Sequence, residues 1–97
     1  MLRHVVLITF VDGTTKAQVA DVTAALDELP PLIDTIQHYT HGPDLHLAEG
    51  RYDYAIVADF ADADGWRVYD THPAHEKARA DVIFPLVAGR ASAQFEV

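Results

Sequence analysis

The stretch LRHVVLITFV, residues 2–11, decides the fold of this sequence. It is rich in β-branched and aromatic residues and is followed by Asp12-Gly13, a pair typical of turns, so it predicts a β-strand. Successive side chains of a strand point to opposite faces, and both faces of this one are apolar. One face carries His4, Val6, Ile8 and Phe10, and the other carries Val5, Leu7, Thr9 and Val11. Both faces are therefore expected to be buried.

Three segments predict helices. Thr15 and Gln18 match a capping box, in which each side chain binds a free backbone N–H group of the first turn. Apolar residues follow at helical spacing, and this helix is expected to end at Pro30-Pro31. They are Val19, Val22, Leu26 and Leu29. Asp62 suits the cap of a short second helix, and residues 73–84 predict a third that begins with a proline.

Three further strands complete the pattern. Residues 35–41 predict a strand closed by Gly42-Pro43, residues 52–60 predict the next, and residues 91–97 alternate between apolar and polar as a closing strand. The element order is β-α-β-β-α-β, which predicts a single α+β domain over residues 1–97 with ferredoxin-like topology.

The apolar character of the first strand also predicts the assembly. Helices of a ferredoxin-like domain cover only one face of the sheet, yet the first strand is apolar on both. The second face must therefore meet another surface, and the same face of a twin subunit is the simplest partner. We expect a homodimer in which two sheets close into a dimeric α/β barrel.

Charge and composition narrow the partners. The formal net charge is −8, with only seven Lys plus Arg, so a nucleic-acid partner and an anionic membrane surface are not expected. The chain has no cysteine, which excludes disulfides, thiolate metal sites and a cysteine nucleophile. The apolar start is too short for a membrane span of roughly 20 residues and lacks a cleavage site. A cytoplasmic protein is expected.

The segment YDTHPAHEKA, residues 69–78, carries the chemistry that the sequence suggests. If His72 caps a helix and Pro73 begins it, His75 lies in the first turn, where the helix dipole favours a neutral imidazole. Neutral imidazole is the form that acts as a general base. The bend expected before Pro73 would bring Tyr69 toward His75. The alternative is that the segment is only a joint between two helices.

A metal site is not expected. His38 and His41 are three residues apart on a predicted strand and so point to opposite faces, while His46 lies in a polar connection. The pair His72 and His75 lacks the further ligands of a metal centre. We therefore predict no metal and no cofactor.

Other conspicuous residues are interpreted as structural. Trp66 and Phe60 are expected in the core, because large aromatic side chains are more often core than ligand contacts. A group of acidic residues near the second helix is interpreted as a solvated face with a helix cap. Its members are Asp59, Asp62, Asp64 and Asp70.

The whole chain resembles the stress-responsive dimeric α/β-barrel family, the Dabb domain. The resemblance rests on LRHVVLITFVDGTT, on EGRYDYAIVADF and above all on YDTHPAHEKA. It implies a homodimer with an interior cavity in each subunit. Within the family, the sequence is similar to polyketide cyclases of the olivetolic acid type. That similarity implies a catalytic His75 and Tyr69 and a cavity-lining His4, whereas Tyr54 stands where those cyclases have a histidine.

Three functions follow as hypotheses. The first is an aldol-type, lyase- or cyclase-like enzyme that acts on a small hydrophobic or carbonyl compound. In it His75 removes a proton, Tyr69 donates a hydrogen bond to the developing enolate, and His4, Tyr54 and His72 contact the substrate. The second is a stress-responsive protein that binds a small molecule without turning it over. The third is a monooxygenase of the antibiotic-biosynthesis type, since related dimeric barrels include such enzymes.

Overall fold

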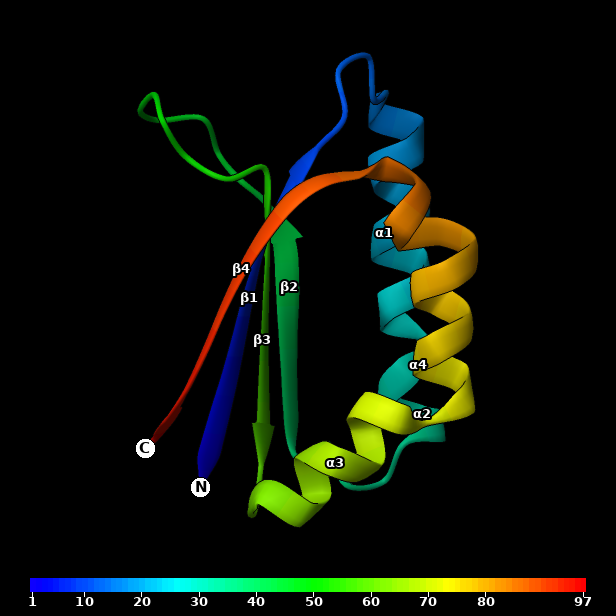
Figure 1. Cartoon of the computed structure of the whole chain (residues 1–97), viewed down its shortest axis with the longest axis vertical. Coiled ribbons are helices and arrows are strands. Elements are labelled where there is room, and N and C mark those ends of the chain that lie inside the picture. The colour runs from blue at the N-terminus through cyan, green and yellow to red at the C-terminus, as the bar shows by residue number, and fades with distance from the viewer.

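The computed structural model describes residues 1–97 and contains one antiparallel four-stranded sheet with helices packed against it (Figure 1). The strands are β1 (Leu2–Phe10), β2 (His38–Pro43), β3 (Tyr54–Phe60) and β4 (Val87–Glu96). Their order across the sheet is β2-β3-β1-β4, so the two strands adjacent in the centre come from opposite halves of the chain. This arrangement confirms the ferredoxin-like topology expected from the sequence.

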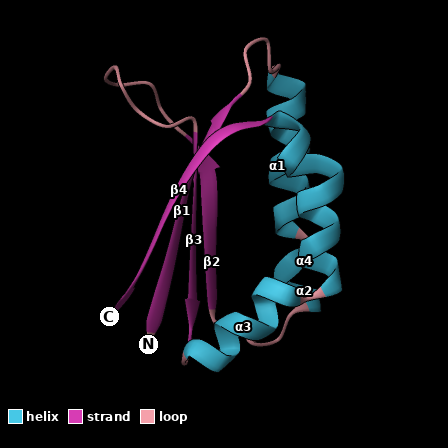
Figure 2. Ribbon diagram, viewed as in Figure 1, coloured by secondary structure: helices cyan, strands magenta, loops and turns pink.

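All helical segments lie on one face of the sheet (Figure 2). The connection between β1 and β2 forms one helical pair, and the connection between β3 and β4 forms another pair that continues into irregular turns. The helices are α1 (Lys16–Asp27), α2 (Leu29–Leu32), α3 (Ala63–Thr71) and α4 (Pro73–Ala78), followed by a π-helical turn (Arg79–Ile83) and a 3₁₀ turn (Phe84–Leu86). No helix is long and apolar enough to cross a membrane.

The helix caps form as expected. The Thr15 hydroxyl accepts the Gln18 N–H at 3.1 Å, and the Gln18 side chain accepts the Thr15 N–H at 2.8 Å. Asp62 accepts the Gly65 N–H at 2.9 Å at the start of α3. The expectation that Pro30-Pro31 ends the helical segment is wrong, because both prolines lie inside α2. Proline is tolerated in the first turn, where its missing N–H costs no hydrogen bond.

Four strand boundaries differ from expectation. Gly42 and Pro43 do not close β2 but belong to it, and they pair with Ala55 and Tyr54. Pro43 fits there because β2 is an edge strand and one side of its ladder is free. The strand begins at His38. In addition, β3 begins at Tyr54 rather than Tyr52, and β4 begins at Val87 rather than Ala91.

The main core lies between the sheet and the helices. The face of β1 that carries His4 and Ile8 packs against the helices, together with the buried face of β3. Twelve buried apolar residues form this core. They are Ile8, Val22, Leu26, Leu29, Ile33, Tyr54, Ile56, Ala58, Phe60, Tyr69, Ala78 and Ile83.

The other face of the sheet has no helix over it (Figure 2). By cross-strand register, Val5 and Val57 lie side by side at its centre, next to Ala93 of β4. Asp59, interpreted above as solvated, is only 4% exposed because Arg3 binds both of its carboxylate oxygens, at 2.8 and 2.9 Å. We call this surface the open sheet face.

The connection from β2 to β3 projects on the same side as the open sheet face (Figure 1). It carries two leucines, Leu45 and Leu47, that are 78% and 84% exposed.

Candidate active site

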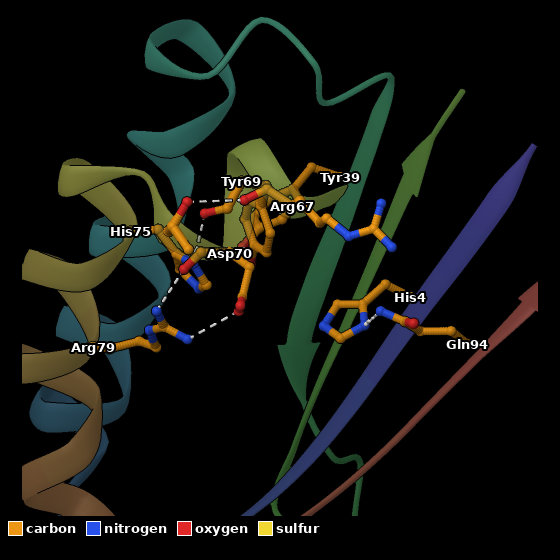
Figure 3. A network of polar contacts seen from close by, with 9 residues as sticks. His4, Tyr39, Arg67, Tyr69, Asp70, His75, Arg79 and Gln94 are labelled. Atoms are coloured by element: carbon orange, nitrogen blue, oxygen red, sulfur yellow. Dashed lines mark hydrogen bonds and ion pairs between the residues drawn. The ribbon is translucent and has the colours of Figure 1, made fainter. Parts of the chain in front are cut away.

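A cavity of about 250 Å³ lies between the sheet and the second helical pair. Strands β1, β3 and β4 supply one wall, and α1, α3, α4 and the turns after α4 supply the other. Figure 3 shows the helix side, with Tyr69, Asp70, His75 and Arg79, facing His4 and Gln94 on the sheet. The lining residues are His4, Val6, Ile8, Leu26, Ile56, Trp66, Tyr69, Asp70, His75, Arg79, Ile83, Phe84, Val87, Arg90, Ser92 and Gln94.

The chain break between α3 and α4 brings Tyr69 and His75 together. His72 has an extended backbone, and its ring Nδ1 accepts the Ala74 N–H at 3.1 Å as the cap of α4. On a continuous helix, residues six apart would point in different directions. Here the Tyr69 and His75 rings stack, with centroids 4.0 Å apart and planes 24° apart. The predicted bend is therefore confirmed, and both side chains line the cavity.

The hydrogen bonds of His75 define its tautomer. Its Nδ1 lies 3.0 Å from the backbone carbonyl oxygen of Tyr69. A carbonyl oxygen only accepts, so Nδ1 carries the proton and donates it. In the neutral ring Nε2 is then unprotonated, with a lone pair free to accept a proton.

The protein also keeps His75 neutral. Burial lowers the pKa of His75 to about 4, and the positive charge of Arg79 adds to this, while Asp70 acts in the opposite direction. The imidazole is 7% exposed. The sequence predicted the neutral form from the helix dipole, and the lowered pKa agrees with that prediction. The main cause is instead desolvation, which penalises the charged form.

The depressed pKa of His75 predicts a stability loss in mild acid. An unfolded histidine has a pKa near 6.5, so between about pH 6.5 and pH 4 the unfolded chain binds more protons than the folded one. The free energy of unfolding should therefore fall across this window, by up to about 3 kcal/mol for this group, and level off below it.

Urea unfolding curves of the wild type and of His75→Gln across that window check this stability loss. Burial also lowers the pKa of His4. His4 and the carboxylates add the same pH dependence to the stability of both proteins. The difference between the two curves isolates His75. Identical pH dependence in the two proteins would show that His75 is not desolvated as described.

Tyr69 has a second partner that the sequence did not indicate. Its hydroxyl lies 2.8 Å from the hydroxyl of Tyr39 on β2, and burial raises the pKa of both phenols. Both hydroxyls therefore stay protonated at neutral pH. When Tyr39 donates to Tyr69, the Tyr69 proton is free for a ligand oxygen. The pair depends on the position of β2 in the sheet, which no local sequence pattern displays.

His4 lies across the cavity from His75. The side-chain amide nitrogen of Gln94 lies 3.0 Å from His4 Nδ1. The His4 ring packs near Trp66 and Tyr69, with centroids 6.0 and 6.4 Å away. The prediction that His4 lines a cavity is confirmed. Trp66, interpreted from sequence as core, also lines the cavity.

Tyr54 and His72, the other residues expected to contact a substrate, do not line this cavity. The Tyr54 hydroxyl is used inside the fold, 2.8 Å from the Thr23 hydroxyl and 2.7 Å from Nδ1 of His41. His41 Nε2 in turn lies 2.8 Å from Asp27. These contacts tie α1 to the sheet, and His72 serves as the cap of α4.

Three charged residues at the cavity were not recognised in the sequence. Asp70, interpreted as part of a solvated face, binds Arg79, whose guanidinium lies 3.3 Å from its carboxylate and 2.6 Å from its backbone oxygen. Arg79 is also the first residue of the π-helical turn. Such turns are frequent at functional sites. Arg90 reaches the cavity from β4. Its position on the inner face follows from the register of β4, which the sequence alone left undefined.

The histidines do not come together as a metal centre. His38 and His41 pair with Asp59 and Ile56 of β3, on opposite faces of the sheet. The structure contains no group of three or more His, Asp or Glu side chains placed to hold a metal ion.

The fold and the cavity define an α+β protein of the ferredoxin-like class with a small buried site beside one sheet face. The chain belongs to the Stress responsive A/B Barrel Domain family, whose sequence model matches residues 2–97. The family resemblance seen in the sequence is therefore confirmed. No match is found among the curated protein sequences.

Solved structures agree on the fold. A dimeric ferredoxin-like protein of unknown function from Thermobifida fusca is 43% identical, with 99% of this chain and 90% of that chain covered and a TM-score of 0.91. A protein from Arabidopsis thaliana is 21% identical, with 100% and 95% covered and a TM-score of 0.84. The hydroxynitrile lyase from Passiflora edulis is 15% identical, with 99% and 92% covered and a TM-score of 0.84. The last two show likeness of fold alone.

Proposed function

We propose that this protein is a homodimeric, cofactor-independent enzyme that forms an enolate from a small carbonyl compound and directs it into an aldol-type, cyclase-like reaction. The observation that carries the proposal is the state of His75. It is buried in the cavity wall and neutral, and its Nε2 is unprotonated, which is the form that can accept a proton from a ligand.

The proposed first step moves one proton. Nε2 of His75 takes the proton from the carbon next to the substrate carbonyl, and the electron pair of that C–H bond becomes the enolate. The Tyr69 hydroxyl donates a hydrogen bond to the enolate oxygen, and Tyr39 supports Tyr69 from behind. The backbone oxygen of Tyr69, which accepts the Nδ1 proton, and the charge of Asp70 favour the new imidazolium, whereas burial and the charge of Arg79 oppose it.

The proposed second step forms a carbon–carbon bond. The enolate carbon attacks a second carbonyl carbon in the same molecule, and the π electrons of that carbonyl move to its oxygen. His75 returns its proton to this alkoxide, which restores the neutral imidazole. The apolar wall formed by Val6, Ile8 and Ile56 excludes water from both steps.

The homodimer is part of the proposal. Two observations support it. By register, Val5, Val57 and Ala93 lie on the open sheet face, which has no helix over it (Figure 2). The relative from Thermobifida fusca is described as dimeric. Burying that face against its twin would remove apolar area from water and close the barrel.

A binding protein without chemistry is the second candidate. The observation in its favour is that the Tyr69 hydroxyl already has a partner in Tyr39. Deuterium exchange separates the two functions. Small ketones and β-diketones in D₂O should gain deuterium beside the carbonyl faster with the protein than in buffer, as followed by proton NMR. A binding protein would leave the rate at the buffer value.

A further inference from the structure

One end of the cavity contains hydrogen-bond donors that have no acceptor in the chain. Nε1 of Trp66 is buried and is the one buried side-chain nitrogen or oxygen without a hydrogen-bond partner. Trp66 lines the cavity. Buried donors are almost always paired, so this unpaired one is unusual. The nitrogen itself has no accessible surface, so Trp66 lines the cavity through its other ring atoms.

His4 supplies a second such donor. Its Nδ1 faces the side-chain amide nitrogen of Gln94, which only donates, so Nδ1 is the acceptor. Burial and the charge of Arg90 lower the pKa of His4, so the ring is neutral and Nε2 carries its one proton. Figure 3 shows this second nitrogen directed into the cavity, toward Asp70 and Tyr69. No hydrogen bond within the chain uses it.

Arg90 adds a free positive charge to the cavity, and this charge acts on His4, whose pKa it lowers. It pairs across the sheet with Ile8, so both side chains lie on the cavity face of their strands. Its guanidinium makes no ion pair or side-chain hydrogen bond, whereas the other cavity arginine, Arg79, is bound to Asp70. The chain has 15 Asp plus Glu, yet Asp70 is the only one that lines the cavity. The cavity is thus a positive site in an acidic protein.

We propose that the ligand of this cavity is a small carboxylic acid in its ionised form, with an apolar or aromatic body. Its carboxylate accepts hydrogen bonds from Arg90 and from Nε2 of His4. Its body lies on the apolar wall. The volume of about 250 Å³ is just below the range of roughly 300–1,000 Å³ found for drug-sized ligands, so the molecule is small.

The proposal that the cavity binds a carboxylate depends only on these hydrogen-bond donors. The further statement that the substrate is a keto acid rests on the function proposed above. In that case Arg90 holds the carboxylate at one end while His75 removes a proton beside the carbonyl at the other.

Trp66 makes the proposal directly measurable, because it is the only tryptophan of the chain. Its ring lines the cavity, so its fluorescence reports a molecule bound there. The probes are benzoate and hexanoate, each compared with its neutral amide, benzamide and hexanamide. We expect both carboxylates to change Trp66 emission and to raise the melting temperature, with affinities at least about tenfold above those of the amides. The preference should shrink as salt is added, because Arg90 is exposed at the mouth.

Two charge-matched variants identify the residue responsible. Arg90→Gln should abolish the preference for carboxylate over amide and leave amide binding unchanged. Arg51→Gln removes the same charge from outside the cavity and should behave as the wild type. Equal affinity for acid and amide, no binding of either carboxylate at millimolar concentration, or a preserved preference in Arg90→Gln would each overturn the proposal.

This experiment is independent of turnover. Benzoate has no proton beside a carbonyl that a base could remove, so it reports binding without enolate formation. If carboxylates bind but no ketone exchanges deuterium, the carboxylate site stands and the proposed enzyme function is wrong. If a ketone exchanges but acids bind no better than amides, the enzyme function stands and the carboxylate site is wrong.

Discussion

Replacing His75 by glutamine is expected to slow deuterium exchange by about 10²–10⁴-fold, the usual contribution of a positioned general base. Glutamine keeps a polar side chain of similar length but cannot take up a proton at neutral pH. Tyr69→Phe should cost about 10²–10³-fold, because it removes the hydrogen-bond donor to the enolate oxygen. Rates are measured by proton NMR in D₂O on any ketone that the wild type exchanges.

Controls separate chemistry from folding. His46→Gln changes an exposed histidine outside the cavity and should keep the wild-type rate. The double variant His75→Gln with Tyr69→Phe should lose less than the product of the two single effects, because groups that act on one transition state are not additive. If both single variants are folded and retain full activity, His75 and Tyr69 are not catalytic, and the binding function takes first place.

Val57→Lys is expected to convert the dimer into a monomer. Val57 lies at the centre of the open sheet face, between Val5 of β1 and Thr40 of β2. In the proposed dimer a lysine there would be buried without a partner, at a cost of several kcal/mol. The dissociation constant should therefore rise by about 10²–10⁴-fold, as measured by sedimentation equilibrium.

A second valine-to-lysine change provides the matched control. Val68 on α3 is 47% exposed and lies on the helix side, so Val68→Lys should leave the dimer intact. A wild type that sediments as a monomer at micromolar concentration would remove the dimer from the proposal. So would a Val57→Lys variant that remains as tightly dimeric as the wild type.

Much of the fold was predictable because its signals are local. The two apolar faces of β1, the capping box at Thr15 and the helix break before Pro73 each follow from a few neighbouring residues. Strand ends were less predictable, since Pro43 looks like a terminator until its edge position is known. The early start of β4 at Val87 depends on an irregularity opposite Thr9 and Phe10, which the sequence does not display.

The candidate site likewise contains residues that a local pattern predicts and residues that it does not. Tyr69 and His75 lie six residues apart, so the local bend was enough to bring them together. Gln94 and Arg90 reach the cavity, and Tyr39 reaches Tyr69, only through strand register and sheet order, which are non-local. The sequence predicted a neutral His75 from the helix dipole, whereas the main cause is burial in the cavity. Burial could not be predicted from the position of the residue in its helix.

The protonation state of His75 is the central claim, and a long-range proton–nitrogen correlation NMR spectrum of the imidazoles measures it directly. The spectrum of His75→Gln assigns the signal by its loss. We predict that His75 is neutral at pH 7, carries its proton on Nδ1, and titrates with a pKa of about 4. A proton on Nε2, or a pKa near the ordinary histidine value of about 6.5, would contradict the proposal that this histidine stands ready as a base.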